Sequence, residues 1–442
     1  MIGSSILRDA PQIPERVMGR AGLVDRQSHR ALSSEWKQII FINRFFYPDH
    51  SATSQLLSDL ASHLAAGGRS VRVITSRQRY DDPDANLPKH ESWHGISIDR
   101  ISTTRFGRKG IAGRGFDYLS FYASVWRTIL VTAEPGALLV AKTDPPLLSI
   151  PALNAVRRRG LHLVNWLQDL YPEVAAEFGM PLMAGRLSRG LARLRDATLR
   201  EAVANVVVGE RMAEMICARG VSPKCVHVIP NWCDDEAIGP LPNDLNPLRR
   251  EWGLEGRFVV GYSGNLGRGH EFRTVLDAAE RLRDDPNIVF VMIGGGKGFP
   301  ELAVEVQRRN LNSSFRFFPY QERATLKYSL GLSDIHWLSL KPELEGLIVP
   351  SKFYGIAAAG RPIISIGARD GEIAKLVERN ACGLVVEPGE GEFLATELRR
   401  LAKSPASITE MGLRARKMLD RHFTRRRAFA YWDKLLDSGF GR

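Results

Sequence analysis

Cysteines, long apolar runs and metal-binding spacings are scarce in this 442-residue sequence. Its four cysteines (Cys217, Cys225, Cys233 and Cys382) form no CxxC pair, which argues against a cysteine-held metal and favours a reducing compartment. No apolar run approaches the about 18 residues of a membrane span. The polar, basic N-terminus lacks a signal-peptide core. We therefore expect a cytoplasmic protein.

Positive charge is in excess. Lysine and arginine number 61 against 49 acidic residues, which gives a net charge of +12. Such a balance indicates a polyanionic partner: nucleic acid, an anionic membrane surface or a phosphorylated substrate. The basic residues are not interleaved with aromatics as in RNA-binding modules, which disfavours nucleic acid. One predicted helix carries arginines on one face and leucines on another, so it is either an ordinary surface helix or a peripheral membrane contact: Arg186, Arg189, Arg193, Arg200, Leu187, Leu191 and Leu194.

Apolar strand-like runs alternate with helix-length segments from Gln38 onward, and 55–66, 121–133 and 428–438 are helix candidates. This alternation predicts βαβ units and doubly wound parallel sheets. There are too many strands for one open sheet, and Pro, Asn, Asp and Gly cluster between Pro230 and Gly253. We predict an N-terminal extension (1–36), a Rossmann-like domain (37–240) joined by a C-terminal helix (426–442), and a second Rossmann-like domain (241–425).

Glycines follow two strands of the second half, after Ser263 and after Ile293. Their spacing matches neither G-x-G-x-x-G nor the Walker pattern, which argues against NAD binding and ATP hydrolysis. Ligands of open α/β sheets bind at such strand ends, although a plain tight turn also explains the glycines. Arg268, in the first of these turns, offers a guanidinium to a phosphate.

A third strand end carries the loop from Lys341 to Lys352. Ser351 is placed to begin a helix, whose first amides favour an anion, and Lys352 adds a positive charge. Glu345 lies upstream and is suited to accept hydrogen bonds from ligand hydroxyls. One loop that offers a carboxylate and a cation suits a phosphorylated sugar.

Several segments together resemble glycosyltransferase family 4: FYPDHSATS (46–54), TDPP (143–146), WLQDLYPE (166–173) and EGLIVPSKFYGIAAAGRPII (345–364). The resemblance extends over nearly the whole chain beyond residue 37. It is nearest to a branch of bacterial exopolysaccharide, O-antigen, capsule and colanic-acid enzymes that includes fucosyl- and fucosaminyltransferases. It implies the α/β GT-B fold, two facing Rossmann-like domains with the active site in an interdomain cleft.

The resemblance also implies transfer from a nucleotide-sugar, with UDP favoured over GDP, to a polyprenyl-diphosphate-linked or saccharide acceptor, with retention of configuration. Donor-binding candidates in the second domain are Gly264, Asn265, Gly267, Arg268, His270, Gly294, Gly295, Tyr320, Glu343, Glu345, Gly346, Leu347, Ile348, Val349, Ser351 and Lys352. Acceptor-side candidates are His50, Ser51, Ala52, Thr53, Gln168 and Asp169.

The sequence departs from the family pattern at its second acidic position. The E-x7-E pair places a second Glu at Gly355 through the small-residue helix, or at Phe353 by ungapped counting, and neither is acidic. We expect Glu372 or a backbone group to replace it. The usual Arg and Lys of the first donor loop are Asn265 and His270, so Arg268 is expected to supply the lost charge.

The departing diphosphate needs positive charge, and the sequence has no convincing Asp-x-Asp at a strand end. We therefore predict no metal and no other cofactor, with catalysis by Arg268, Lys352, Glu345 and Asp169. Asp169 is expected to orient or deprotonate the acceptor hydroxyl, although a helix cap explains it too. The main alternative activity is a nucleotide-sugar epimerase of the same architecture, and an NAD-dependent oxidoreductase is less favoured.

Overall fold

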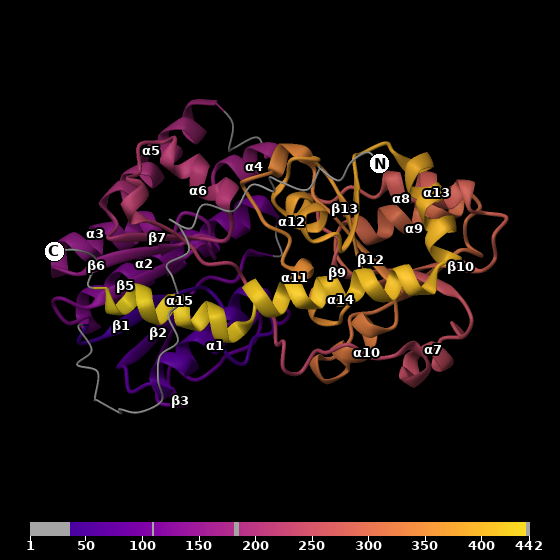
Figure 1. The fold of residues 1–442 in the computed structure, drawn as a ribbon. Helices are drawn as coiled ribbons and strands as arrows, with labels where there is room; N and C mark the ends of the chain where they lie inside the picture. Colours follow the sequence, from indigo (N-terminus) through magenta and orange to yellow (C-terminus); the bar gives the residue numbers. More distant parts are fainter. Residues whose placement is uncertain (1–35, 108–109, 181–184, 439–442) are drawn as a thin grey trace, which may run out of the picture. The chain divides into compact units, whose positions relative to one another are not determined.

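The computed structural model describes residues 36–107, 110–180 and 185–438, which belong to one compact unit. They contain two parallel α/β sheets (Figure 1). Residues 1–35 of the expected extension lie outside the described residues. Trp36 does not belong to it, because its side chain is buried and its Nε1 donates to the carbonyl oxygen of Leu436 at 3.0 Å.

The first domain is built on an eight-stranded sheet in the order β3-β4-β2-β1-β5-β6-β7-β8. All neighbouring strands are parallel except β3 and β4. Its strands are β1 (Ile39–Ile42), β2 (Val71–Ser76), β3 (His90–Trp93), β4 (Ile96–Ile101), β5 (Leu138–Lys142), β6 (His162–Trp166), β7 (Ala204–Val207) and β8 (Val226–Val228). Its helices are α1 (Ala52–Ala66), α2 (Ile111–Thr132), α3 (Ser149–Arg159), α4 (Glu173–Glu177), α5 (Gly185–Glu201) and α6 (Glu210–Cys217).

The second domain has a six-stranded parallel sheet in the order β11-β10-β9-β12-β13-β14. Its strands are β9 (Phe258–Asn265), β10 (Ile288–Gly295), β11 (Phe315–Phe318), β12 (Ile335–Ser339), β13 (Ile363–Ile366) and β14 (Gly383–Val386). Its helices are α7 (Pro247–Glu251), α8 (Arg273–Arg281), α9 (Gly298–Arg308), α10 (Leu326–Gly331), α11 (Lys352–Ala358), α12 (Glu372–Asn380), α13 (Gly391–Ala402) and α14 (Pro405–His422).

Each sheet is buried on both faces, as its continuous apolar runs require. In β1, Ile39 and Phe41 pack into one core cluster with α1, while Ile40 and Ile42 pack into another with α2 and α3. Strand order reverses at β1 and β5 in the first sheet and at β9 and β12 in the second. The carboxyl ends of these strands are therefore the expected ligand-binding edges.

The last helix, α15 (Arg425–Asp437), returns to the first domain, whereas α14 packs on the second (Figure 1). Trp432 and Leu436 of α15 enter the first domain's core, and Asp433 bonds to His63 of α1 at 2.8 Å. The family resemblance implied such a crossing.

The two domains share an apolar junction. Leu170 and Met212 of the first domain belong to the same buried cluster as Leu347 and Phe353 of the second. The backbone N–H of Leu170 donates to the carbonyl oxygen of Leu347 at 2.9 Å. This junction fixes the loop before α11 against the segment after β6.

Sequence patterns missed two local features. The β3–β4 hairpin turns at His94 and Gly95, both with positive φ, and histidine is not the usual residue there. Helix α2 begins at Ile111 rather than near Phe121. Gly113 lies in the first turn, and a glycine there weakens the helix signal in the sequence. The position requires glycine, because a Cβ on residue 113 would lie 2.0 Å from the carbonyl oxygen of Phe106.

Candidate functional site

The ends of β9 and β10 meet at two glycines. Gly264 and Gly294 pair in register, with φ of +127° and +128°. A Cβ on Gly294 would lie 2.2 Å from the carbonyl oxygen of Gly264, and one on Gly264 would lie 2.9 Å from Cε of Lys352. Only glycine therefore permits this packing. It brings three predicted donor residues from separate segments to one sheet edge.

Lys352 and His270 form a pair at this edge. Nδ1 of His270 is 2.7 Å from the carbonyl oxygen of Ser339, which only accepts, so Nδ1 carries the proton. Nε2 of His270 is then free to accept from the Lys352 ammonium at 3.2 Å. Burial, followed by the charge of Lys352, lowers the pKa of His270 to about 4. The histidine is neutral at physiological pH.

Lys352 keeps its charge near neutrality. Burial lowers the pKa of its ammonium to about 8. Besides His270, the ammonium lies 5.2 Å from the ring centroid of Tyr262. No further hydrogen bond of Nζ appears within the described residues. Donor hydrogens therefore remain for an anion at the end of β9.

Asn265, Gly295 and Tyr320 border the same edge. A Cβ on Gly295 would lie 3.0 Å from the Tyr320 ring, and one on Gly296 would lie 2.1 Å from Oδ1 of Asn265. The side chains of Asn265 and Tyr320 are exposed. The structure thus gathers these predicted donor residues around the glycine strand ends.

Arg268 lies apart from Lys352 in the structure. Its side chain is exposed, and Nη1 makes a long 3.5 Å hydrogen bond to the carbonyl oxygen of Phe178 in the first domain. No contact joins it to Lys352 in the described ranges. Gly267 precedes it in the turn, and its role and that of Arg268 remain predictions.

The loop before α11 presents its backbone rather than its apolar side chains. Leu347 and Val349 are buried in the domain junction, whereas Glu343 is exposed. Gly346 has φ of +76°, and a Cβ there would lie 2.5 Å from Sδ of Met215. Ser351 precedes α11 without capping it through its side chain, and α11 has only seven residues. The helix end is therefore weaker than the sequence suggested.

Glu345 and Glu372 are both bound to helix N-termini. Glu345 accepts from the backbone N–H of Glu372 at 3.2 Å, and burial raises its pKa. Glu372 accepts from the backbone N–H groups of Glu210 and Arg211 at 3.2 and 3.1 Å, at the start of α6. The structure does not support Glu372 as the replacement for the missing family Glu, because its carboxylate already has these partners.

Asp169 lies where the two domains meet. It follows β6, and its backbone forms an isolated antiparallel bridge with Ile348 of the loop before α11. Burial raises the pKa of its carboxyl to about 6; the charge of Asp144 raises it further, and that of Lys142 opposes the shift. A carboxyl with that pKa is suited to proton transfer near neutrality.

Lys142 and Asp144 belong to this charged cluster, and our sequence reasoning missed both. The Lys142 ammonium donates to the carbonyl oxygen of Thr53 at 3.1 Å and lies 3.6 Å from the ring centroid of Trp166. Burial lowers its pKa to about 7, while Asp144 and Asp169 oppose the shift. A lysine that ends an otherwise apolar strand was the available signal.

The other acceptor-side candidates lie at the start of α1 and after β6. His50 and Ala52 are exposed, and Ser51 is the residue before α1. Gln168 is buried and accepts from Nδ2 of Asn231, another missed residue, at 2.8 Å. The Gln168 side chain therefore has a structural partner, and whether it contacts an acceptor remains a prediction.

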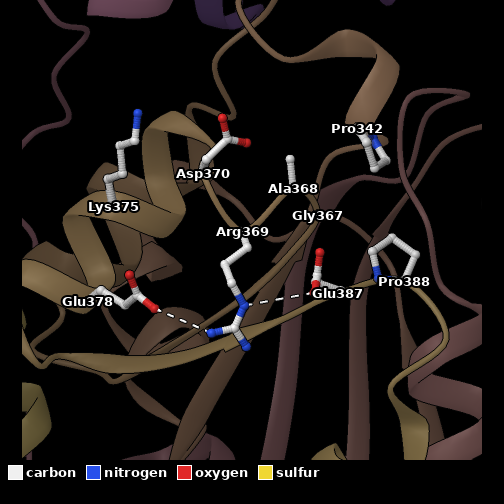
Figure 2. Close-up of a pocket in the computed structure, with 9 residues that line it drawn as sticks. All are labelled: Pro342, Gly367, Ala368, Arg369, Asp370, Lys375, Glu378, Glu387 and Pro388. Carbon is white, nitrogen blue, oxygen red and sulfur yellow. Dashed lines mark ion pairs between the residues drawn. The ribbon is translucent and has the colours of Figure 1, made fainter.

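Another hollow lies at the ends of β13 and β14. It has a volume of about 610 Å³ and none of the predicted donor residues lines it. Figure 2 shows the Arg369 guanidinium between the carboxylates of Glu378 and Glu387, each 3.8 Å away. These side chains are exposed, and such ion pairs contribute little. We do not assign the donor to this hollow.

No group of three or more His, Cys, Asp or Glu side chains within the described ranges is arranged to hold a metal ion. The four cysteines are not disulfide-bonded. No helix in the described part of the chain is long and apolar enough to span a membrane.

Two doubly wound domains that share an apolar junction have the architecture of the GT-B fold. Comparison with family models agrees: residues 53–232 match the glycosyl transferase 4-like domain, and residues 246–418 match glycosyl transferases group 1. The chain therefore contains two glycosyltransferase domains, one matching each of these families. The expected family, fold and enzyme class are thereby confirmed.

Curated relatives have the same two-domain extent. The chain is 26% identical over 390 residues to a putative colanic acid biosynthesis glycosyl transferase, WcaI, of Escherichia coli K12, covering 85% of this chain and 95% of that one. It is 24% identical over 299 residues to a probable glycosyltransferase, WbjE, of Pseudomonas aeruginosa, covering 66% and 72%.

Solved structures share the fold. HepE of Anabaena, solved in complex with UDP, aligns over 91% of this chain and 100% of its own, with a TM-score of 0.68 and 17% identity. Sucrose-phosphate synthase from Thermosynechococcus elongatus aligns over 91% and 99%, with a TM-score of 0.71 and 16% identity.

Proposed function

We propose that this enzyme transfers a sugar from a nucleoside diphosphate donor to a lipid-linked or saccharide acceptor in cell-surface polysaccharide synthesis. The colanic-acid name of the Escherichia coli relative supports the process. HepE structures with UDP and UDP-glucose favour UDP, while a Mycobacterium tuberculosis relative over half the chain is named GDP-mannose-dependent. UDP is our preferred nucleotide.

The observation that carries this proposal is the packing of Lys352 against Gly264 beside neutral His270. A diphosphate at the end of β9 receives the Lys352 ammonium, whose side chain reaches this strand end because Gly264 has no Cβ. Positive charge held in place stabilises the developing charge of the leaving nucleotide. Lys352, with Arg268 recruited from its exposed position, supplies this charge without a metal.

On the acceptor side, Asp169 orients or deprotonates the attacking hydroxyl. Its backbone contact with Ile348 places it against the loop that carries Glu345 and Lys352. The family resemblance favours retention of anomeric configuration, with attack on the face that the nucleotide leaves.

Helix α5 is the proposed contact with an anionic membrane leaflet. Leu187 and Leu194 are 55% and 53% exposed, so these two leucines do not enter the core. Arg186, Arg189 and Arg193 are exposed on the same helix. Exposed leucines with neighbouring arginines suit peripheral attachment beside a lipid-linked acceptor.

The test is calorimetric titration with UDP, GDP, dTDP and CMP, with and without EDTA. We expect UDP to bind with an affinity that EDTA leaves unchanged and that Lys352→Met weakens. Nuclear magnetic resonance of a donor-only incubation separates transfer from the epimerase alternative, which interconverts the sugar without an acceptor. Failure of all four nucleotides to bind would refute the proposal, and loss of binding in EDTA would refute its metal independence.

A further inference from the structure

A second cavity, of about 330 Å³, lies in the first domain and shares only Asp144 with the residues discussed above. It opens at the carboxyl ends of β1, β2 and β5. Four arginines line it: Arg44, Arg79, Arg105 and Arg114. Its volume is at the lower end of ligand pockets, which run from about 300 to 1,000 Å³. The arginines indicate an anionic ligand.

Arg44 is held rigidly at the centre of this edge. Its backbone N–H donates to the carbonyl oxygen of Asp144 at 2.7 Å, and its carbonyl oxygen accepts from the N–H of Ser76 at 3.0 Å. The guanidinium lies 5.1 and 5.2 Å from the ring centroids of Phe45 and Tyr118. The side chain is only 14% exposed. Its position does not depend on a ligand.

The buried Arg44 guanidinium lacks a dedicated carboxylate. Nη2 makes one long hydrogen bond, to Gln78 at 3.3 Å, and is 4.0 Å from Oδ2 of Asp117. Asp117 also accepts from the backbone N–H groups of Phe106 and Gly107 at 2.9 and 2.8 Å. Nε of Arg44 is buried with no hydrogen-bond partner among the described residues. An anion in the cavity would satisfy donors that the protein leaves unpaired.

The outer arginines are available to a ligand. Arg79 pairs with exposed Asp81 at 2.8 Å, an interaction that solvent screens. Arg105 and Arg114 are exposed and make no ion pair with a described residue. Asp84, Asp117 and Asp144 also line the cavity. Burial raises the pKa of Asp144 to about 6, and the charge of Arg44 opposes the shift, so this carboxyl is mostly ionised at neutral pH and interacts electrostatically with Arg44.

The cavity adjoins the proposed reaction centre through Asp144. This residue follows β5, and its charge acts on Asp169 at the end of the neighbouring strand β6. Asp144 therefore couples this cavity electrostatically to Asp169.

We propose that this arginine-lined cavity binds the phosphate or diphosphate of the acceptor. The inference rests on the proposed glycosyl transfer. It assigns the arginines of this cavity to acceptor recognition, separate from the Lys352 site proposed for the donor diphosphate.

The test uses the full chain saturated with UDP, because a free diphosphate also competes for the donor site. Farnesyl diphosphate, inorganic pyrophosphate, glucose 1-phosphate and farnesol are titrated by calorimetry. We expect farnesyl diphosphate to bind and Arg105→Ala/Arg114→Ala to weaken it by roughly tenfold or more, because each guanidinium makes charge-assisted bonds.

Arg127→Ala is the matched control, because Arg127 is exposed on the same helix as Arg114 and does not line the cavity. It should leave every affinity unchanged, and all variants should bind UDP and melt as the wild type does. Glucose 1-phosphate binding tighter than farnesyl diphosphate would assign a soluble sugar phosphate to the cavity, and the reverse order a lipid-linked diphosphate. If UDP binds but no phosphorylated probe does, or if the double arginine variant binds like the wild type, the cavity assignment fails while the proposed function stands.

Discussion

Replacing Lys352 with methionine removes one charge and keeps most of the side chain's length against Gly264. We expect kcat/KM for the donor to fall by roughly 10²–10³-fold, because loss of one preorganised charged donor at a developing negative charge costs about 3–4 kcal/mol. UDP affinity should fall too, since the nucleotide retains the diphosphate. Steady-state kinetics and calorimetry on the same preparations measure both effects.

Loss of folding would not explain this result. Burial already disfavours the Lys352 ammonium, as its lowered pKa of about 8 shows. Removing the charge therefore relieves desolvation in the unliganded protein, and we expect an unchanged or slightly higher melting temperature. A variant that is as stable as the wild type but inactive separates the chemical role of the lysine from its packing.

The pH dependence gives an independent test with a defined sign. The Lys352 cation is the active form, so kcat/KM should fall as the pH rises through about 8. Arginine at this position stays charged, so Lys352→Arg should not show the fall of kcat/KM above about pH 8. Neutral His270 does not titrate in this range, because its pKa is about 4.

Lys341→Met is the matched control, because Lys341 is exposed at the start of the same loop. Its charge loss should change kcat/KM less than about threefold, as for a screened surface charge. The reasoning is refuted if Lys352→Met keeps kcat/KM within threefold of the wild type. If kcat/KM of Lys352→Arg still falls above about pH 8, the assignment of this titration to the Lys352 ammonium is refuted.

Three further predictions concern other parts of the site. Asp169→Asn should lower kcat by at least about 10²-fold while UDP affinity is kept. The wild-type fall of kcat/KM below pH 6, where the carboxyl protonates, should vanish in this variant. Leu187→Ser/Leu194→Ser should reduce flotation with anionic vesicles, and equal wild-type recovery with neutral and anionic lipid would contradict the membrane contact. Glu372→Gln should cost about 1–2 kcal/mol, because its charge meets two helix amides, and an unchanged urea midpoint would contradict this.

The fold was largely predictable because both sheets are buried on two faces. Runs such as Ile39–Ile42 and Ile288–Ile293 are apolar without interruption, which is typical of buried parallel strands. The β3–β4 hairpin was not predictable from this signal, because β3 is an exposed edge strand and its turn uses His94. Its pattern resembles that of a polar loop.

Site residues that the backbone conformation requires, such as glycines, were predictable from the sequence. Side-chain hydrogen bonds between distant segments were not. The glycines at 264 and 294 stand out in the sequence. The sequence pattern does not reveal that Glu372 binds the start of α6, 162 residues earlier in the chain. Arg44 was missed for the same reason, since β1, β2 and β5 place its neighbours from segments up to 100 residues apart.

The family resemblance implies a second cation in the first donor loop, and this sequence has His270 there. A neutral imidazole that accepts from Lys352 orients the ammonium but adds no charge to the diphosphate. A diphosphate leaving group carries more negative charge than one lysine offsets, and we propose that Arg268 supplies the rest. Among the described residues Arg268 has only a 3.5 Å bond to Phe178 to give up, which costs little. Donor binding is therefore expected to draw Arg268 away from the first domain and to couple occupancy of the donor site to the contact between the domains.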